Sequence, residues 1–390
     1  MSQQPTTYID PDTGRPVTRW TSGEHKDQHL YLTGPSVTAD DRWLVIISQR
    51  DGHPNLWAID RQSGAARQLS RNRNGKRMSY CHSDGGPAGL SKSSPSLDAT
   101  RGRVYTVIDD RLERIDLVDG ATTVLTDIPA GWITAFTQVS ADGTRICVPL
   151  TPATAFADTD SDGDQARQME AVHARVAAGS VRSRLLIVDT TTGTTRCAAE
   201  VPFWVTHVQF DPHDADRVLF NSEGHWHQQD AIARMWMLEA DGTTHPLIDQ
   251  APGLRLGHEC WTPDGRSIVY HGYSEGGHLL RAGGHFIGRC DAHGTVIEEI
   301  PMADAAVHHA CLLNDGRYLA DTFDNRLVVI DPRSNPATTT TICRTDIRHR
   351  ADQDVHPHAV PTPRGVLFTS DRASPADVYE VMIEPAPPMG

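Results

Sequence analysis

The clearest pattern in the chain is a regular alternation of short apolar runs with polar turns. Each run has the length of a strand rather than a helix and is rich in Val, Ile, Leu and Thr. In the first repeat the runs are residues 44–47 and 56–60, followed by a turn at Gly64, and in the second they are residues 104–108 and 112–116. Seven such units of about 40 to 50 residues, each with four short strands, predict an all-β, seven-bladed β-propeller.

The last repeat reaches the end of the chain one strand short of a full blade. Residues 13–20, near the N-terminus, have a glycine turn followed by a strand pattern and match the missing fourth strand. We therefore expect this N-terminal strand to pair beside the C-terminal strand near Val378, so that the two ends of the chain share one blade and close the ring. A closed ring of blades leaves only short, protected sheet edges. An open β-solenoid and a pair of β-sandwiches are the alternatives.

The repeats run along the whole chain, so we expect residues 1–390 to form a single propeller domain, since all-β chains of this length can fold as one unit. One insertion interrupts the rhythm. Residues 151–184, within the third blade, are mostly polar, and residues 164–174 have the pattern of a short helix.

Composition limits the classes of function. The net charge is −14, which argues against nucleic-acid binding because such binding relies on a basic surface. An anionic ligand would need a local cation, supplied by a metal or an arginine. No apolar run approaches the roughly 18 residues that suggest a membrane span, and the first residues show no signal peptide. Seven scattered cysteines without CxxC spacing do not resemble a disulfide framework, so we expect a reducing cytoplasm, with no membrane partner.

Histidines recur where the first strand of each repeat begins, and six of these openings contain at least one. They are His29, His82, His207, His258, the pair His308 and His309, and the pair His356 and His358. First strands and the loops that lead into them line the central channel of a propeller, so we expect these side chains to converge. A single histidine at such a position is more often a hydrogen-bonded residue of a turn or core, but six equivalent openings favour a shared site.

The most informative segment is residues 353–358, which read Gln-Asp-Val-His-Pro-His. Alternate residues of an extended segment point the same way, so His356 and His358 can face one cavity. Neutral imidazole suits Mn, Fe and Zn, and the amide oxygen of Gln353 suits the harder ions. The segment is therefore a candidate half-site for a divalent metal. The alternative is a strand entrance whose histidines bind backbone carbonyls.

Longer motifs, present together and in order, make the chain similar to a known family. They are His-Val-Gln-Phe-Asp-Pro at 207–212, Asn-Ser-Glu-Gly-His-Trp-His at 221–227, Ala-Arg-Met-Trp at 233–236, Gly-His-Glu-Cys-Trp-Thr-Pro-Asp-Gly at 257–265, and residues 353–358 with Val-Leu-Phe-Thr-Ser-Asp-Arg at 366–372. In these motifs the chain resembles the oligogalacturonate lyases, seven-bladed propellers that cleave short uronate chains by β-elimination. The likeness covers most of the chain.

The resemblance implies a metal site. Members of the family hold a divalent ion, typically manganese, on three histidines and one glutamine. The glutamine and two of the histidines match Gln353, His356 and His358. The third matches the opening of the sixth repeat, where His308 and His309 compete and we prefer His309.

The resemblance also implies a catalytic pair. The general base of the family is the histidine of its His-Glu-aromatic-Trp motif, which is His258 here, and the assisting arginine matches Arg234. Two positions depart from the family pattern. Cys260 replaces an aromatic residue, and Ala359 follows His358 where proline is usual. We expect both departures to lie near the substrate pocket.

These residue types suit an elimination. The proton next to a uronate carboxylate is weakly acidic, and a neutral histidine is a competent base near pH 7. A divalent ion on that carboxylate delocalises the developing charge, and an arginine can hold the acid group. We therefore predict a carbon–oxygen lyase that acts on an acidic oligosaccharide, as in pectin degradation, and leaves a 4,5-unsaturated uronate.

Other functions compete with this prediction. The same machinery could act on a different uronic-acid glycan, or the propeller could be a non-catalytic scaffold that binds proteins. Residues 272–276 also match the G-x-S-x-G motif of serine hydrolases, which needs a strand before it and a helix after it. Here we expect the motif inside a blade hairpin, which argues against a serine hydrolase.

Overall fold

The computed structural model of the protein describes residues 4–21, 23–74, 76–77, 89–91, 93–157, 165–224, 226–276, 283–302, 306–349, 353–373 and 375–384. These residues form seven β-sheets, one for each blade of the predicted seven-bladed β-propeller, so the all-β prediction is confirmed. Their contacts divide the chain into two compact units. Unit 1 comprises Met1–Arg50, Trp57–Arg67 and Gly253–Gly390, and unit 2 comprises Asp51–Leu56 and Gln68–Pro252. The assignment of one domain to the whole chain stays a prediction.

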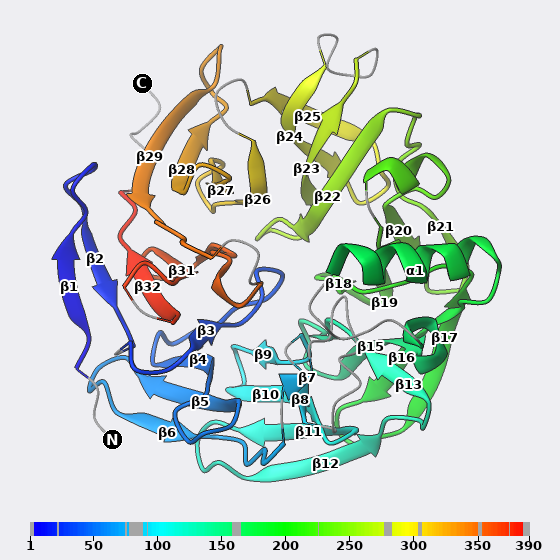
Figure 1. Ribbon diagram of the computed structural model, residues 1–390, viewed down its shortest axis with the longest axis horizontal. Helices are drawn as coiled ribbons and strands as arrows, with labels where there is room; N and C mark the ends of the chain where they lie inside the picture. Colours follow the sequence, from blue (N-terminus) through cyan, green and yellow to red (C-terminus); the bar gives the residue numbers. More distant parts are fainter. Residues whose placement is uncertain are drawn as a thin grey trace. The chain divides into compact units, whose positions relative to one another are not determined.

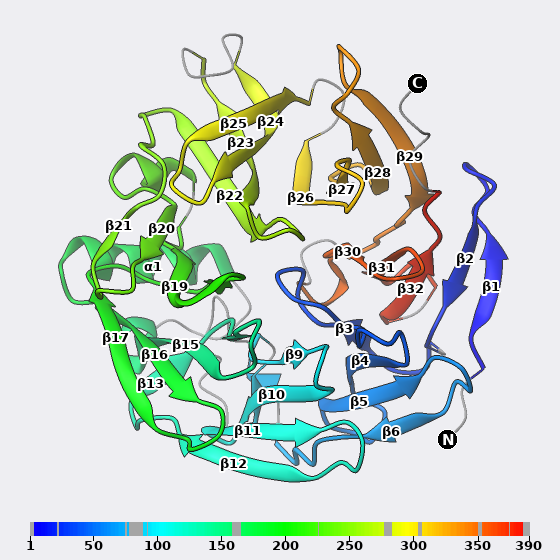
Figure 2. The ribbon, with the colours of Figure 1, turned by 180° about the vertical axis from the view of Figure 1, so that it is seen from behind.

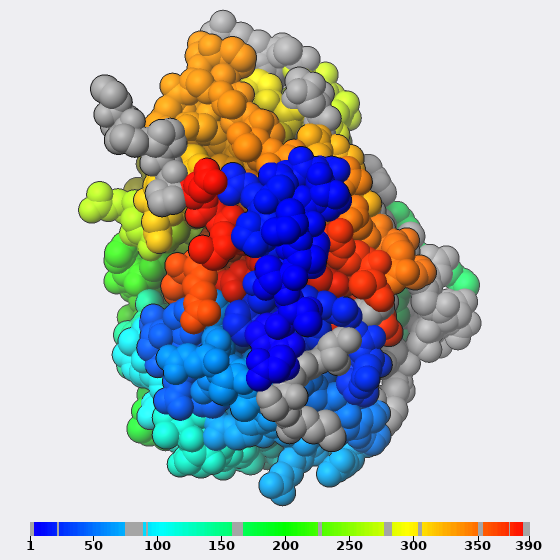
Figure 3. Space-filling model, turned by 90° about the vertical axis from the view of Figure 1, so that its left-hand side faces the viewer, coloured from blue at the N-terminus to red at the C-terminus, as the bar shows by residue number. Residues whose placement is uncertain are grey.

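The two ends of the chain share one sheet of unit 1, as predicted. Its strand order is β1 (Thr6–Ile9), β2 (Pro16–Arg19), β32 (Asp377–Val381), β31 (Val366–Ser370) and β30 (Val360–Pro361). Strand β2 pairs antiparallel with β32, and the amide of Trp20 donates to the carbonyl of Val378 at 2.8 Å. Figures 1 and 2 show β2 beside β32, and Figure 3 shows the N-terminal residues lying over the C-terminal ones. Strand β1, a fifth strand outside β2, was not predicted.

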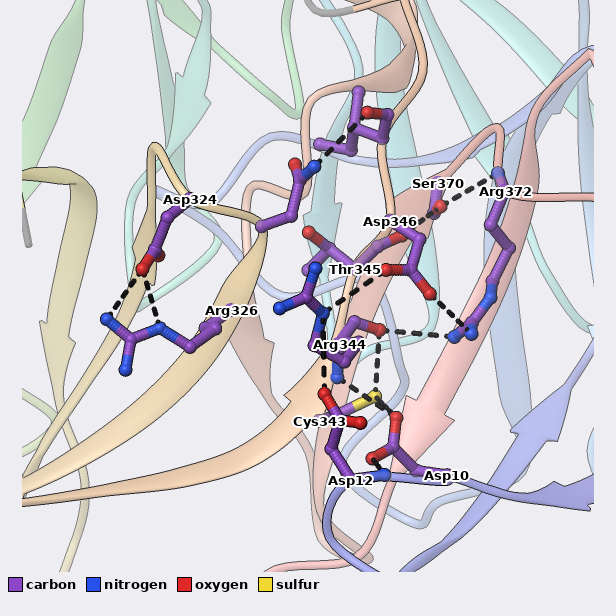
Figure 4. Close-up of polar contacts among 12 residues, drawn as sticks. Asp10, Asp12, Asp324, Arg326, Cys343, Arg344, Thr345, Asp346, Ser370 and Arg372 are labelled. Carbon is purple, nitrogen blue, oxygen red and sulfur yellow. Dashed lines mark hydrogen bonds and ion pairs between the residues drawn. The ribbon is translucent and has the colours of Figure 1, made fainter.

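Polar contacts fasten this N-terminal segment to the neighbouring strands (Figure 4). The Asp10 carboxylate accepts a hydrogen bond from the backbone amide of Arg344 at 3.1 Å. Asp346 binds the Arg344 side chain at 3.3 Å and the Arg372 guanidinium at 2.7 Å. Arg372 in turn donates to the hydroxyl of Tyr8. Because these contacts join residues from both ends of the chain, they stabilise the shared blade in addition to its strand pairing.

Three further sheets, whose residues lie wholly or mostly in unit 1, are four-stranded and follow sequence order. The first contains β3 (Asp27–His29), β4 (Trp43–Ser48), β5 (Asn55–Asp60) and β6 (Ala66–Gln68). The second contains β22 (Leu254–Trp261), β23 (Ser267–Ser274), β24 (Gly284–Asp291) and β25 (Val296–Pro301), and the third β26 (Val307–Leu312), β27 (Tyr318–Thr322), β28 (Arg326–Asp331) and β29 (Thr338–Arg344). A short 3₁₀ helix, η3 (Gln353–Val355), precedes β30. Buried Val, Leu, Ile and Tyr side chains of several strands form a shared hydrophobic core, as the apolar runs predict.

Unit 2 contains the remaining three sheets. The first has β7 (Lys76–Arg77), β8 (Leu90–Ser91), β9 (Ser96–Asp98), β10 (Arg103–Ile108), β11 (Arg111–Asp116) and β12 (Thr122–Asp127). The second has β13 (Trp132–Thr134), β14 (Gln138–Val139), β15 (Arg145–Pro152), β16 (Ser183–Asp189) and β17 (Thr195–Val201), and the third β18 (Val208–Asp211), β19 (Asp214–Asn221), β20 (Met235–Leu238) and β21 (Thr244–Pro246). Two 3₁₀ helices, η1 (Ala153–Phe156) and η2 (Trp226–Asp230), lie in connections.

The helix expected within residues 151–184 is α1 (Gln165–Ala177), which comes between β15 and β16 in the chain. It is the long green helix of Figure 1. Its residues Val172 and Val176 are buried in one core cluster with Trp204. The burial explains why a polar insertion keeps a helix, because these two apolar positions one turn apart pack into the core. Gln168, one turn before Val172, is buried as well, whereas Arg167 and Glu170 are exposed.

The G-x-S-x-G segment lies in a hairpin. Ser274 ends β23 and pairs with Gly284 at the start of β24. A nucleophile elbow requires a helix at this point, so the serine hydrolase reading fails. No helix among the described residues has both the length and the apolar character needed to cross a membrane.

Candidate metal and base site

Five histidines of unit 1 come together in what we call the histidine cluster: His258 from β22, His308 and His309 from β26, and His356 and His358 from the segment between η3 and β30. The ring centre of His309 lies 4.2 Å from that of His258 and 4.6 Å from that of His358. The rings of His308 and His356 are 4.8 Å apart. Residues distant in sequence thus meet at one place.

Two β-bulges, in β22 and β26, bring three of these side chains into the cluster. In β22, Gly257 pairs with His271 and Cys260 pairs with Val269, so His258 and the following residue form a bulge. In β26 the register shifts between Val307 and His309, which leaves His308 as the extra residue. A bulge re-aims side chains, and this is why the adjacent residues His308 and His309 both reach the cluster although strand alternation would separate them.

The backbone is strained at two of the five histidines. The φ angles of His258 and His358 are +49° and +41°, in the left-handed region that side chains other than glycine rarely adopt. Outliers of this kind gather at functional sites, where the surrounding structure holds them. The extended geometry expected for His356 and His358 is not found, because they lie in an irregular segment and not in a strand. Their rings still face each other, with centres 5.6 Å apart.

Within the cluster, two groups of three histidines each have potential ligand atoms within 4.8 Å of one another. One group is His309, His356 and His358, the three histidines proposed from the sequence as metal ligands. The other is His258, His308 and His309. His309, and not His308, therefore accompanies the pair His356 and His358. The side chain of Gln353, the fourth expected ligand, lies outside the described residues, although its backbone is part of η3.

Asp321 of β27 orients His309. Its carboxylate is fully buried, and its two oxygens lie 3.0 and 3.1 Å from the Nδ1 atom of His309. A carboxylate only accepts hydrogen bonds at neutral pH, so Nδ1 of His309 carries the proton and Nε2 keeps its lone pair. This carboxylate–histidine arrangement is the usual support of a metal ligand. Sequence reasoning missed Asp321, because only the register of β26 against β27 places it opposite His309.

The chemistry of the donor set fits a divalent transition metal. Burial, and after it the neighbouring His309, keep the pKa of His308 well below its usual value, so its imidazole is neutral. Neutral imidazoles are the form that binds metals, and three of them suit Mn, Fe or Zn. Among the described residues, neither group of metal-capable side chains includes a carboxylate. A site of this kind keeps the positive charge of the ion available for an anionic ligand.

His29, one of the histidines at the strand openings, has a structural role. Its Nε2 donates to the backbone carbonyl of His358 at 2.9 Å, and its Nδ1 accepts from the hydroxyl of Thr369 at 2.6 Å. Burial lowers the pKa of His29 to about 4, which keeps it neutral. His29 therefore holds the strained backbone of His358 in place. His82, another of these histidines, lies outside the described residues.

Arg234, the proposed catalytic arginine, belongs to a buried polar group in unit 2. Its Nη1 atom lies 3.4 Å from the Glu223 carboxylate, which also accepts hydrogen bonds from Thr206 at 2.6 Å and from Asn221 at 2.9 Å. Burial alone would raise the pKa of Glu223, but Arg234 and the hydrogen bond from His207 hold that pKa well below its usual range. Arg234 is therefore oriented by a charged partner that the sequence did not predict. Because His258 and Arg234 lie in different units, their pairing stays a prediction.

The two departures from the family pattern prove to be core residues. Cys260 and Ala359 are both buried in the hydrophobic core of unit 1, and the Cys260 thiol donates to the carbonyl of Ala310 at 3.3 Å. Their side chains therefore face the core and not the histidine cluster, and the expectation that both residues lie near the substrate pocket stays a prediction.

Comparisons with known proteins identify the same family as the sequence motifs. A family model described as "Oligogalacturonate lyase" matches residues 1–292. An oligogalacturonide lyase of Pectobacterium atrosepticum is 26% identical over 279 residues, and an oligogalacturonate lyase of Dickeya dadantii is 33% identical over 94 residues. The alignments cover 68% and 24% of this chain, and they span 63% and 24% of the length of these relatives.

Two solved structures share the fold over nearly the whole chain. An oligogalacturonate lyase in complex with manganese superposes with a TM-score of 0.82 at 25% identity, over 98% of this chain and 97% of the other. An oligogalacturonate lyase of Vibrio parahaemolyticus superposes with a TM-score of 0.80 at 22% identity, over 98% of both chains.

Proposed function

The chain belongs to the oligogalacturonate lyase family, and on this premise we propose that it cleaves 4-O-linked uronate oligosaccharides by metal-dependent β-elimination. The observation that supports the proposal most is the group of His309, His356 and His358, whose ligand atoms lie within 4.8 Å of one another. The presence of manganese in a structure with the same fold supports the choice of ion. A lyase for a different uronic-acid glycan would use the same residues.

Four residues would hold the ion: His309, His356 and His358 through their imidazoles, and Gln353 through its amide oxygen. When bound, the ion would neutralise the substrate carboxylate and stabilise the negative charge that develops on removal of the neighbouring proton. Asp321 keeps the Nε2 atom of His309 available for this role.

His258 is the proposed general base. It removes the proton next to the uronate carboxylate at its Nε2 atom, the electron pair of the broken C–H bond forms the new double bond, and the C–O bond to the leaving sugar breaks. The leaving oxygen is protonated from solvent, to which His258 later returns its proton, so no water is consumed. Arg234 is proposed to hold the uronate carboxylate, with its own geometry maintained by Glu223.

We further propose that the reaction serves the breakdown of pectin fragments inside the cytoplasm. The six described cysteines form no disulfide, which suits a reducing compartment. The substrate is an acidic oligosaccharide, so with a net charge of −14 the protein needs the ion and the arginine to attract it.

The test is incubation of purified protein with a panel of uronate oligosaccharides and Mn²⁺, with detection of the unsaturated product by its ultraviolet absorbance. Metal analysis of the wild type and of His356→Ala accompanies it, and His293→Ala, in an exposed turn between β24 and β25, is the matched control. We expect His356→Ala to lose both the ion and the activity, and His293→Ala to keep both. A wild-type protein that binds no ion and releases no unsaturated product would refute the proposal and favour a binding scaffold.

A further inference from the structure

His271 lies directly behind the proposed base. It belongs to β23, it is only 3% exposed, and its Nε2 atom lies 2.8 Å from the Nδ1 atom of His258. The two rings are nearly parallel, with an interplanar angle of 18° and centres 5.1 Å apart. Two imidazole nitrogens at this distance share one proton in a hydrogen bond.

The local backbone is built for this contact. His271 pairs with Gly257, and a Cβ atom on Gly257 would lie only 3.1 Å from the His271 Nε2. The missing side chain leaves room for the His271 ring beside the bulge. The positive φ of His258 then turns its ring back toward that ring instead of along the strand. Three features of the backbone thus converge on one hydrogen bond.

The direction of this hydrogen bond decides whether His258 can act as a base. If His258 donates through Nδ1, its Nε2 carries a lone pair and can accept a proton. If His271 donates instead, the Nε2 of neutral His258 is already protonated and cannot. We propose that His271 is a positioning residue that accepts a hydrogen bond from Nδ1 of His258, and thereby fixes the tautomer and the ring orientation that proton removal requires.

The same bond acts during the reaction. Once His258 has taken up a proton at Nε2, both of its nitrogens are donors, and the Nε2 lone pair of His271 accepts from the cationic ring. A hydrogen bond to a charged donor is stronger than one between neutral groups, so His271 also stabilises the protonated base. The inference rests on the proposed function, because it takes His258 as the base of the lyase.

The first test compares two variants at His271. His271→Gln can place its amide oxygen as an acceptor for Nδ1 of His258, whereas His271→Leu cannot. We expect His271→Leu to lower kcat by more than about tenfold, toward the 10²–10⁴ of losing the base itself, with KM and manganese content close to the wild type. His271→Gln should recover most of the rate. His285→Leu, a partly buried histidine on the neighbouring strand β24, is the matched control and should keep full activity.

The second test needs no lyase activity. Nitrogen-15 NMR of histidine-labelled wild-type protein, with the His258 signals assigned by their loss in His258→Ala, reports which ring nitrogen carries the proton. We expect the Nδ1–H tautomer for His258. Protonation at Nε2, or a kcat in folded His271→Leu equal to that of the wild type, would overturn the inference. If the wild type has no lyase activity, the proposed function fails, and the NMR result still decides whether His271 sets the tautomer.

Discussion

Replacing Asp321 with asparagine should weaken metal binding although Asp321 is not itself a ligand. The buried carboxylate holds the Nδ1–H of His309 with two oxygens at 3.0 and 3.1 Å. Asparagine has nearly the same shape and can keep one acceptor oxygen, so the side chain still fits. What is lost is the negative charge that makes the opposite nitrogen of His309 a better donor to the ion.

The size of the effect follows from the position of Asp321, which binds the proposed ligand His309 and not the ion itself. Partners of metal-bound histidines typically change affinity by about 10- to 100-fold, or about 1.4 to 2.7 kcal/mol. Metal binding also stabilises the fold. At an ion concentration of about 100 Kd the wild type gains about 2.7 kcal/mol, whereas a variant with 100-fold weaker binding gains only about 0.4 kcal/mol at the same concentration.

Two measurements check this prediction. Calorimetric titration of the metal-free protein with Mn²⁺ gives the affinity, and the thermal midpoint with and without Mn²⁺ gives the stabilisation. Asp324→Asn is the control, since Asp324 lies three residues away in the same hairpin and pairs with the Arg326 side chain (Figure 4). Equal Mn²⁺ affinities for the wild type and Asp321→Asn would refute the reasoning that Asp321 supports a metal ligand.

Three further predictions concern stability and substrate binding. Trp20→Ala should destabilise the protein by about 3–5 kcal/mol in urea unfolding, because the indole is buried and donates to Glu380 at 3.0 Å; an unchanged midpoint would contradict the role of the N-terminal strand. Burial raises the pKa of Glu299 to about 7. Between the usual pKa of glutamate and pH 7 the native state therefore binds more protons than the unfolded state, and the free energy of unfolding falls as the pH rises through that window. Glu299→Gln should therefore be more stable than the wild type at pH 8, by about 1 kcal/mol after allowance for partial exposure, and should lose this advantage at pH 4. Arg234→Ala should raise KM and lower kcat together, since the guanidinium can contact the carboxylate before and during proton removal; a change in neither would remove Arg234 from the site.

The fold was predictable because strand length, turn residues and repeat spacing all follow from local chemistry. The pairing of β2 with β32 could be predicted from a missing strand at one end of the chain and a spare strand pattern at the other. Strand β1 was missed because it is only four residues long, with a mostly exposed sequence that has no apolar alternation. Its place in the sheet depends on the partner β2 and not on its own residues.

The site was predictable in its residue types but not in its geometry. His356 and His358 were proposed from their spacing and His309 from a resemblance, and the structure brings the three together. The supporting residues Asp321 and His271 could not be found in the same way. Each is placed by strand register, and the relevant registers are shifted by bulges that leave no mark in the hydrophobic pattern.

Contacts from residues distant in sequence also allow the strained histidines to persist in this structure. Left-handed backbone costs roughly 1–3 kcal/mol at each non-glycine residue, so it survives only where other contacts over-determine it. Here the carbonyl of His358 is held by buried His29, and the ring of His258 is held by buried His271. In both cases the holding residue lies far away in the sequence or on a neighbouring strand, so the positions of the rings depend on tertiary packing and not on local preference. Preorganisation of this kind makes a site precise. Removing a holding residue should therefore alter the geometry of the histidine cluster even where the net charge of the cluster stays the same.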